Sequence, residues 1–515
     1  MVTCDEKLPE SELNELLCEF KGGAALSVKM TFCEKTESLF YTVEDETGRK
    51  KEYEYNKTFG ESVGEKAGEN DGKNIGGDIV QKIEKPAYKP VNGTFGGELN
   101  KKSVDEISKT NKNSEAEKAR LFALEKKRVI KRFAKLSLYD FLCEKFKTEL
   151  PWGALTGIRP TKLYYQQPEK KREEFLKGQM RVSQKKLEVL EKIATAQKDY
   201  YCPDESACAF YVGIPFCPTR CQYCSFISCE ISKCDCLSEY VDALCKEIEE
   251  SKKLVKNLRS VYIGGGTPSS IPLDLLEKVL KAVGEVSCEY TVEAGRADCI
   301  NEELLTLLKN YGVKRVCVNP QTFCDDTLKL MGRNHTAEQA EQAYLLAKSM
   351  GFLINMDLIA GLPLETFETF KNTIEKALFL RPDNLTVHTL CLKKGSKLKE
   401  LCERLPECEI EKMIDYSSLR AAEEGYSPYY LYRQKYMAGN LENTGYSLKG
   451  RECVYNIDVM EEITQNVACG ANAVSKRVRF NQSRIERYGA PKDIHTYINK
   501  IDEIIKEKQK LFAED

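Results

Sequence analysis

Six short apolar runs, set in regular alternation with helix-like segments, constrain the fold of this chain more than any other feature. They lie between Ala207 and Leu390 and read FYVGI, SVYIGG, YTVEAG, RVCVNP, LINMDLIAG and LTVHTL. Roughly 20 to 45 residues separate one run from the next, which leaves room for a helix and its loops. Continuous apolar runs of this length are typical of buried parallel strands. The pattern therefore predicts an α/β fold with an open, partial (β/α)6 barrel, because a closed barrel of this kind needs eight units.

Helix boundary signals agree with this alternation. Thr336 and Gln339 have the spacing of a capping box at the start of a helix, and Gly312 and Gly351 fall where helices are expected to end. In parallel α/β folds, ligands bind at the carboxyl ends of the strands. We therefore expect the functional residues to lie on or just after the six runs.

The rest of the chain divides by composition into segments around this barrel. Alternating stretches between residues 24 and 57, with a turn-like Glu-Thr-Gly, predict strands near the N-terminus. A later stretch is rich in Gly, Lys, Glu and Asn and has too few large apolar residues to offset the entropy of ordering. We predict a small N-terminal α+β domain (1–60), a disordered insertion (61–115), a helical segment (116–200), the partial barrel (201–400) and a C-terminal α/β extension that closes the barrel mouth (401–515).

Charge and cysteine content exclude some classes of protein. The chain has 78 Lys and Arg residues against 80 Asp and Glu residues, so no global charge attracts nucleic acid or a membrane. The basic run KKRVIKR at 126–132 fits either an anion contact or a solvated helix face. The 22 cysteines are scattered, and no export signal or long apolar run accompanies them, so we expect reduced thiols, a cytoplasmic location and no stable membrane insertion. We also expect a monomer.

Three cysteines follow the first predicted strand at the spacing CxxxCxxC. Cys217, Cys221 and Cys224 on one short loop can bind three irons of a [4Fe–4S] cluster and leave the fourth iron open to another ligand. The alternatives are a zinc knuckle, which needs a fourth Cys or His, and cysteines without a metal. The position of the loop after a barrel strand favours the cluster.

The segment YVGIPFCPTRCQYCSF resembles the radical S-adenosylmethionine (SAM) superfamily, with Tyr223 as the aromatic residue before the third cysteine. The resemblance implies that the open iron chelates the amino and carboxylate groups of SAM. One electron then cleaves SAM to methionine and a 5′-deoxyadenosyl radical. The run Gly264–Pro268, GGGTP, is similar to the element of that family that meets the SAM amino group, although a glycine run by itself also fits a tight turn.

Further stretches narrow the resemblance. From about residue 150 to about residue 477 the chain resembles the oxygen-independent coproporphyrinogen III dehydrogenase group (HemN type), and in particular its HemZ-like branch. The stretches that carry this resemblance are TVEAGRAD, VNPQTF, MGRNHT, INMDLIAGLP, LTVHTL, YYLYRQKYMAGNLENTGY and YNIDVMEE.

Transferred position by position, this resemblance implies a set of cofactor contacts and no catalytic residue beyond the cluster and the SAM radical. The implied contacts are Tyr211, Tyr223, Gly265, Gly266, Thr267, Glu293, Gln321, Arg333, Asp357, Cys391 and Val474. Carboxylates suit ribose hydroxyls, and Arg333 suits a carboxylate. A carboxylate that pairs with a neighbouring lysine is the alternative for each acidic residue.

Other residues leave two interpretations open. Arg433 and Lys435 fit either substrate propionates or an exposed surface pair, and His388 fits either a ligand contact or a structural hydrogen bond. Cys229, Cys234 and Cys236 form CxxxxCxC, which fits a second cluster or, without a nearby histidine in the sequence, packing as small apolar residues.

The function that this resemblance implies is anaerobic oxidative decarboxylation of coproporphyrinogen III to protoporphyrinogen IX in haem biosynthesis. Two propionates become vinyl groups, two SAM molecules are consumed, and the electron donor is a protein such as a flavodoxin or ferredoxin. Phe226 departs from this group, whose well-studied members have a cysteine there. The alternatives are therefore a radical SAM methyl or alkyl transferase that acts on haem, and a haem chaperone that keeps the cluster.

Overall fold

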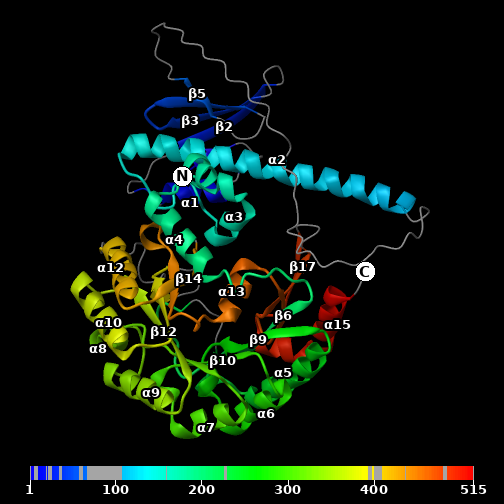
Figure 1. Ribbon diagram of the computed structural model, residues 1–515, viewed down its shortest axis with the longest axis vertical. Helices are drawn as coiled ribbons and strands as arrows, with labels where there is room; N and C mark the ends of the chain where they lie inside the picture. The colour runs from blue at the N-terminus through cyan, green and yellow to red at the C-terminus, as the bar shows by residue number, and fades with distance from the viewer. Residues whose placement is uncertain are drawn as a thin grey trace. The chain divides into compact units, whose positions relative to one another are not determined.

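The computed structural model describes residues 2–4, 8, 10–18, 20, 26–33, 38–56, 62–66, 107–157, 159–224, 229–391, 397–398, 409–434, 437–479 and 484–513. The chain forms two compact units. Residues 1–14 and 23–145 make up the first unit, and residues 15–22 and 146–515 make up the second. Each unit has its own sheet (Figure 1).

The N-terminal elements are β1 (Val2–Cys4), α1 (Glu10–Cys18), β2 (Leu26–Cys33), β3 (Ser38–Asp45), β4 (Lys50–Asn56), β5 (Ser62–Lys66) and α2 (Ile107–Phe146). Their sheet has the order β1-β2-β3-β4-β5, in which only the β1–β2 pair is parallel. The Tyr41 hydroxyl donates to the Ile130 carbonyl of α2 at 2.9 Å, and Lys145 pairs with Asp45 at 2.6 Å. The hydrogen bonds of Asp45 to Lys145 and Thr47 lower the pKa of its carboxyl. The sheet and α2 are therefore tied by both packing and charge.

The range 61–115 differs from its prediction. Strand β5 pairs with β4, which gives its backbone groups hydrogen-bond partners despite its polar composition, and α2 already begins at Ile107. These two parts of the predicted disordered insertion are therefore ordered elements, and residues 67–106 lie outside the described residues.

The strands of the second unit are β6 (Ala207–Ile214), β7 (Phe216–Cys217), β8 (Cys229–Glu230), β9 (Asn257–Gly265), β10 (Glu289–Gly295), β11 (Arg315–Val318), β12 (Leu353–Ala360), β13 (Asn384–Thr389), β14 (Ser427–Tyr432), β15 (Asn443–Ser447), β16 (Gln465–Cys469), β17 (Val474–Arg479) and β18 (Arg484–Gly489). The main α-helices are α3 (Pro160–Gln166), α4 (Gln184–Ala196), α5 (Leu237–Lys252), α6 (Leu273–Val283), α7 (Glu302–Asn310), α8 (Asp325–Leu330), α9 (Ala337–Ser349), α10 (Phe367–Leu380), α12 (Ile410–Glu423), α13 (Val454–Glu461), α14 (Ile494–Asn499) and α15 (Ile501–Phe512).

The six predicted strands are present and lie side by side. In the 11-stranded sheet, β13, β12, β11, β10, β9 and β6 are consecutive neighbours, and each pair is parallel. Helices α5 to α10 (green to yellow) lie along the outer side of these strands (Figure 1). The capping box of Thr336 and Gln339 begins α9 as predicted. The sheet has two free edges, so the barrel is partial.

Side chains alternate along the parallel strands between a core and an inner face. On β12, Ile354, Met356 and Leu358 pack in the core against the helices. Asn355 and Asp357, in the intervening positions, line a cavity on the other face. Because successive side chains of a strand point to opposite faces, the same short run supplies both core and site.

The C-terminal extension adds strands to the barrel sheet. Strands β15 and β14 join the sheet beside β13, whereas β16, β17 and β18 join it beside β6 at the other edge. Residues beyond 401 therefore extend both edges of one sheet, because their strands find backbone partners on the two exposed edge strands of the barrel.

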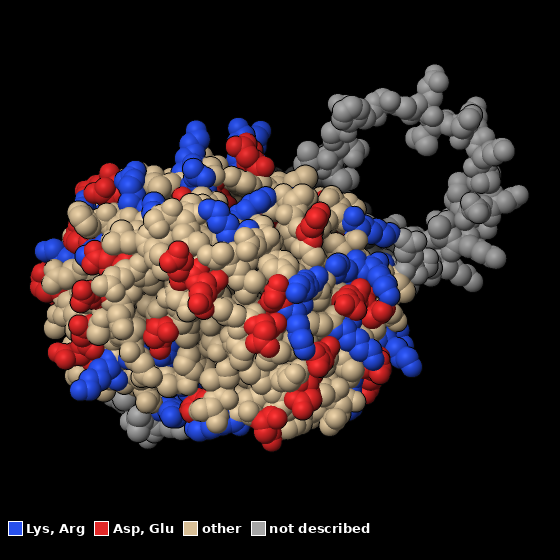
Figure 2. Space-filling model, turned by 90° about the horizontal axis from the view of Figure 1, so that it is seen from below, with Lys and Arg blue, Asp and Glu red and all other residues tan. Residues whose placement is uncertain are grey.

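The described helices include none that is long and apolar enough to cross a membrane. On the face drawn in Figure 2, Lys and Arg side chains are interspersed with Asp and Glu side chains over the described residues. This distribution agrees with the near balance of charge in the sequence.

Candidate functional site

A cavity of about 530 Å³ opens at the carboxyl ends of the six parallel strands. Its volume lies within the range of small-molecule sites, which is about 300 to 1,000 Å³. The cavity is lined by residues of the cysteine loop, of the barrel strands or the turns that follow them, and of the C-terminal extension. The sequence-predicted residues that line it are Tyr211, Cys217, Cys221, Tyr223, Cys224, Gly265, Gly266, Thr267, Glu293, Gln321, Arg333, Asp357, His388 and Cys391.

The cysteine loop leaves β6 and returns through a short parallel pair. Phe216 and Cys217 form β7, which pairs with β8. The loop is anchored to the barrel by backbone hydrogen bonds from Thr267 to Phe216 at 2.7 Å and from Gln222 to Met331 at 3.0 Å. All three predicted cluster cysteines line the cavity, and the Thr267 hydroxyl donates to Cys217 Sγ at 3.6 Å.

The glycine run after β9 forms a cradle beside this loop. A Cβ on Gly266 would overlap the Phe216 carbonyl and lie 3.0 Å from Cys217 Sγ, and a Cβ on Gly264 would lie 2.7 Å from Glu293 Oε2. Gly265 has φ +114°, which L side chains rarely adopt. Glycine is therefore required here, because the backbone of the run lies close to the cysteine loop and to Glu293.

Arg333 holds the aromatic residue of the loop. It is buried, and its guanidinium donates to the Tyr223 hydroxyl at 3.0 Å, to the Asn319 carbonyl at 2.6 Å and to Cys221 Sγ at 3.9 Å. Burial raises the pKa of Tyr223, so this phenol stays neutral. Asn319 Oδ1 is buried and has no hydrogen-bond partner among the described residues.

A second arginine, which sequence reasoning missed, anchors the start of the loop. Arg296 donates to the Thr219 hydroxyl at 2.6 Å and pairs with Asp298 through two nitrogens, at 2.9 and 2.6 Å. Burial would raise the pKa of Asp298, but the neighbouring His335, whose Nδ1 lies 3.7 Å away, and the hydrogen bonds from Arg296 hold it well below its usual range. The signal was the position of Arg296 directly after the third apolar run.

Glu293 lies at the carboxyl end of β10 beside the cradle. It accepts a hydrogen bond from the Tyr262 hydroxyl at 2.6 Å and one from the Gly265 backbone N–H at 3.2 Å. Desolvation by burial raises the pKa of this carboxyl to about 7, although the Tyr262 hydrogen bond opposes the shift. Glu293 is therefore an acceptor whose charge changes near neutral pH.

Asp357 and His388 form a polar wall on the neighbouring strands β12 and β13. His388 Nε2 lies 3.8 Å from Asp357 Oδ2, its Nδ1 lies 3.2 Å from the Tyr432 hydroxyl, and Asn355 donates to Asp357 at 2.8 Å. Burial would raise the pKa of Asp357, but the nearby His388 imidazole and the hydrogen bond from Asn355 lower it. Asp357 is thus an ionised acceptor, in contrast to Glu293.

Gln321 reaches the cavity through an unusual backbone conformation. It has φ +70° and is fixed by backbone hydrogen bonds to Asp357 at 3.0 Å and from Ile359 at 2.9 Å. A residue other than glycine in this region costs conformational energy and occurs where the surrounding structure imposes it. The strain is therefore located next to the predicted contact residues.

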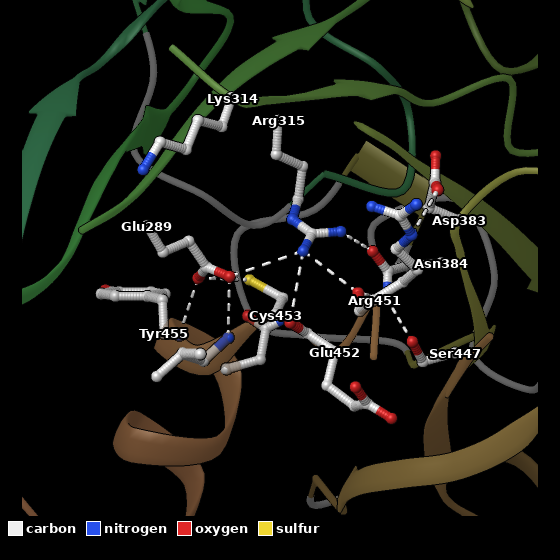
Figure 3. Close-up of polar contacts among 12 residues, drawn as sticks. Glu289, Lys314, Arg315, Asp383, Asn384, Ser447, Arg451, Glu452, Cys453 and Tyr455 are labelled. Carbon is white, nitrogen blue, oxygen red and sulfur yellow. Dashed lines mark hydrogen bonds and ion pairs between the residues drawn. The ribbon is translucent and has the colours of Figure 1, made fainter. Parts of the chain in front are cut away.

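Beside the predicted Tyr211, the inner face of the barrel carries two stacked tyrosines that the sequence did not single out. The rings of Tyr262 and Tyr455 stack with centroids 4.4 Å apart, and the Tyr211 ring is 6.3 Å from the Tyr455 ring. Tyr455 belongs to α13, whose N-terminal N–H groups at Val454 and Tyr455 donate to Glu289, both at 3.0 Å. Figure 3 shows this carboxylate between the start of α13 and Arg315.

Some predicted residues are not part of this cavity. Val474 begins β17 and is 40% exposed, and it is not among the residues that line the cavity. Arg433 is buried, stacks over Trp152 and donates to the Leu155 carbonyl and to Asn440. The propionate-binding hypothesis for Arg433 is therefore wrong, because the fold already uses its guanidinium. Lys435 and Phe226 lie outside the described residues.

The residues of the cavity fit the cluster and SAM that the sequence motif implies. Three thiols lie on one loop at the cavity, the cradle is closed to any side chain at Gly264 and Gly266, and a buried amide oxygen of Asn319 is left for a ligand. Thiolates are the ligands that such clusters use, and the polar wall offers acceptors for hydroxyl and ammonium groups.

Comparisons with known proteins agree with this site. The model of the radical SAM superfamily matches residues 211–377. HemZ of Bacillus subtilis (strain 168), an oxygen-independent coproporphyrinogen-III oxidase-like protein, is 37% identical over 383 residues, which cover 70% of this chain and 76% of that protein. The heme chaperone HemW of Lactococcus lactis is 29% identical over 317 residues, which cover 59% of this chain and 79% of that protein.

Among solved structures, coproporphyrinogen III oxidase (HemN) from Escherichia coli is similar, with a TM-score of 0.48 and 20% identity over 60% of this chain and 72% of that chain. The identity to HemZ extends over more than two thirds of both chains. The chain therefore belongs to the radical SAM superfamily, in its group of HemN- and HemZ-like proteins.

Proposed function

We propose that this protein is an oxygen-independent coproporphyrinogen III dehydrogenase, which converts two propionate side chains of coproporphyrinogen III to vinyl groups. One observation carries the proposal: a single cavity brings together three cysteines, a glycine cradle and a wall of ionisable residues. Support for the substrate comes from HemZ, which is named as an oxygen-independent coproporphyrinogen-III oxidase-like protein.

The chain's own residues would bind and orient the reactants. Cys217, Cys221 and Cys224 would hold the cluster, and the Gly264–Gly266 cradle would place the methionine part of SAM beside it. When bound, the cluster and SAM supply a carbon radical that abstracts one hydrogen atom. Glu293 and Asp357 would accept hydrogen bonds from the ribose hydroxyls, because both carboxylates face the cavity on neighbouring parts of the sheet.

The overall conversion at each propionate balances with an external electron acceptor. Loss of one hydrogen atom from the β-carbon, then of carbon dioxide and one electron, leaves a vinyl group. Two propionates react, so two SAM molecules are consumed for each substrate. The stacked rings of Tyr211, Tyr262 and Tyr455 would exclude water from one side of the reacting centre.

A haem chaperone is the second candidate, because several heme chaperones named HemW are similar to this chain, two of them over 59% and 38% of its length. A chaperone would bind haem stoichiometrically and would produce neither carbon dioxide nor a vinyl product. The two candidate functions therefore differ in their products, because only the dehydrogenase releases carbon dioxide and a vinyl-bearing tetrapyrrole.

An anaerobic assay separates them. Reconstituted protein is incubated with SAM, a low-potential reductant and coproporphyrinogen III, and the products are followed by mass spectrometry. We expect protoporphyrinogen IX and two 5′-deoxyadenosines per product. Haem binding without a vinyl product would select the chaperone, and a methylated tetrapyrrole would select a methyl or alkyl transferase.

Two cysteine variants, one at the cluster loop and one away from it, serve as a matched pair for this assay. Cys221→Ser removes one cluster ligand and is expected to reduce product to background, because an incomplete thiolate set cannot hold the cluster. Cys288→Ser changes a half-buried thiol that does not line the cavity and is expected to leave product formation unchanged.

A further inference from the structure

We propose that this protein has a second metal site, for one Zn²⁺, built from three cysteines that follow the cluster loop and a histidine near the C-terminus. The ligands are Cys229, Cys234, Cys236 and His495. Of these, Cys229, Cys234 and Cys236 are the CxxxxCxC run that the proposed reaction does not use. None of the four lines the cavity described above.

The fold brings the histidine to the cysteines across a long stretch of sequence. Cys229 lies in β8, Cys234 ends a short turn, and Cys236 is the residue before α5. His495 lies in α14, which packs against α5. In the sequence no histidine is near these cysteines, so the fourth ligand type becomes visible only in the folded chain.

Two of the distances between the donor atoms are close to those around one tetrahedral ion. Cys236 Sγ lies 4.0 Å from Cys234 Sγ and 4.0 Å from His495 Nε2. The Cys229 thiol is a neighbour of the Cys234 thiol, and burial and then this neighbour raise its pKa. Two thiolates on one zinc are about 3.8 Å apart and a thiolate and an imidazole nitrogen about 3.5 Å apart, given zinc bond lengths of about 2.3 and 2.0 Å.

An oxygen donor lies at the same place. Asp235 Oδ1 is 3.6 Å from His495 Nε2, and Asp235, Cys236 and His495 each offer one donor atom within 4.8 Å of the others. Three sulfurs and one imidazole form a ligand set that is common in structural zinc sites, and carboxylate is a weaker choice beside them. We therefore assign Asp235 to the margin of the site.

Neither alternative for these thiols fits as well. A disulfide requires sulfurs about 2.05 Å apart, whereas the Cys234 and Cys236 sulfurs are 4.0 Å apart. Packing as small apolar residues predicts buried side chains, yet only Cys236 is buried and the His495 side chain is 62% exposed. A cluster of half-exposed thiols beside a histidine is the arrangement of metal ligands.

The position of the site suggests what the ion does. In the parallel pair of β7 and β8, Phe216 faces Cys229 and Cys217 faces Glu230. Cys229 is therefore paired with the strand that leads into the first cluster cysteine. Zinc would tie the exit of the cluster loop to α5 and α14 and so restrict the loop at its base.

The test uses the full chain and measures metals rather than activity. Protein purified without oxygen is stripped with a chelator, refilled with zinc, desalted, and analysed for zinc and iron per chain. We expect one tightly held zinc. Loading with Co²⁺ in place of zinc should give the intense visible absorption of tetrahedral thiolate-bound cobalt.

Matched variants place the ion. Cys236→Ser and His495→Asn are each expected to lower retained zinc at least about ten-fold, while Cys245→Ser, on α5 but outside the group, should retain it. Triple replacement of Cys217, Cys221 and Cys224 by Ala should remove iron and leave zinc. This last variant separates the proposed site from the cluster.

Three results would overturn the proposal. The first is folded wild-type protein, verified by circular dichroism, that retains neither zinc nor cobalt after refilling. The second is a second iron–sulfur cluster, seen as about twice the iron of a single cluster, that Cys236→Ser removes. The third is zinc that persists in both Cys236→Ser and His495→Asn, which would place the ion elsewhere.

Discussion

The two ends of the same parallel strands differ sharply in how their polar groups are used. Strands β10, β11 and β13 begin at Glu289, Arg315 and Asn384, whose side chains form a closed network with residues 451–455 (Figure 3). The same strands end at an open cavity that contains Glu293 and His388, and Asn319 just after β11 has an unpartnered oxygen there.

This difference shows how one scaffold divides stability from binding. At the starting end, Arg315 donates to Asn384 and to the carbonyls of Arg451 and Glu452, at 3.1 and 3.2 Å for the two carbonyls. Both terminal nitrogens of Arg315 have partners within the chain, and only its buried Nε has none among the described residues, so this end contributes rigidity. The cavity end keeps its acceptors for a ligand, as parallel α/β folds do.

At the cavity end, the substitution with the largest expected effect on cluster binding is Gly266→Ala. The new methyl group would overlap the Phe216 carbonyl and press on Cys217, so the loop must shift. We expect the cluster content of reconstituted protein to fall by more than about ten-fold, because overpacking of this size costs about 1 to 3 kcal/mol or more and displaces a ligand. Iron analysis and the visible spectrum measure it.

Gly178→Ala is the matched control for that change. A Cβ at Gly178 meets nothing within 4 Å, so its cluster content should equal that of the wild type. Equal iron content in both alanine variants would show that the cradle does not restrain the loop.

At the closed end, Arg315→Met is expected to destabilise the chain and spare ligand binding. It leaves Glu289, whose side chain is only 12% exposed, without its cation. We expect the free energy of unfolding in urea to fall by about 3 to 5 kcal/mol, as when one partner of a buried ion pair is removed. The dissociation constant for SAM should change less than about threefold, since the cavity residues are unchanged.

Arg451→Met is its control, because that side chain is 53% exposed and lies 3.7 Å from Asp383, a pair worth less than about 1 kcal/mol. A large loss of SAM affinity in Arg315→Met without a loss of stability would contradict the division between the two ends.

The raised pKa of Glu293 predicts a pH dependence confined to the cavity end. Ribose hydroxyls donate to the ionised carboxylate, so SAM affinity should rise with pH until the pH passes about 7, by at most about ten-fold per unit. In the ligand-free chain the sign is opposite: the folded state binds this proton more tightly than the unfolded state. That contribution to stability is present at low pH and is lost as the pH rises through about 7.

Titration calorimetry between pH 5.5 and 8.5 on wild type and Glu293→Gln checks this, with the variant expected to lose the slope. Asp357→Asn is the matched control, because the pKa of Asp357 is lowered and its carboxylate does not titrate in this interval. A slope that persists in Glu293→Gln would assign the titration to another group.

The smallest effect is expected at Val474, which the family resemblance placed in the SAM site. Its side chain is exposed on β17, so Val474→Asn should leave the dissociation constant for SAM within about twofold of the wild-type value. If calorimetry showed a ten-fold weaker affinity for SAM, Val474 would have to be counted among the residues that contact SAM.

The parts of the fold that the sequence predicted depend on residues that are close together in the chain. The six strands, the capping box at Thr336 and the CxxxCxxC loop all follow from spacing, since side-chain period and ligand geometry act over a few residues. The polar positions on β12, Asn355 and Asp357, could have been found by the same alternation.

The predictions that differed from the structure concern residues whose partners lie far away in the chain. The composition of 61–115 did not reveal that Ser62–Lys66 pairs with β4, because strand pairing depends on the partner. Arg433 has the chemistry of a propionate ligand, yet the Leu155 carbonyl and Asn440 use its guanidinium, across 278 residues in the case of Leu155.

By itself, the sequence determined the parallel barrel strands, the cluster loop and the glycine cradle, because each is encoded within one short segment. Only the tertiary structure decided that the C-terminal strands extend both edges of the sheet, that Tyr455 stacks inside the barrel, and that His495 meets Cys236. These contacts join residues that are far apart in the chain, and their side chains meet only when the sheet and its covering helices have packed.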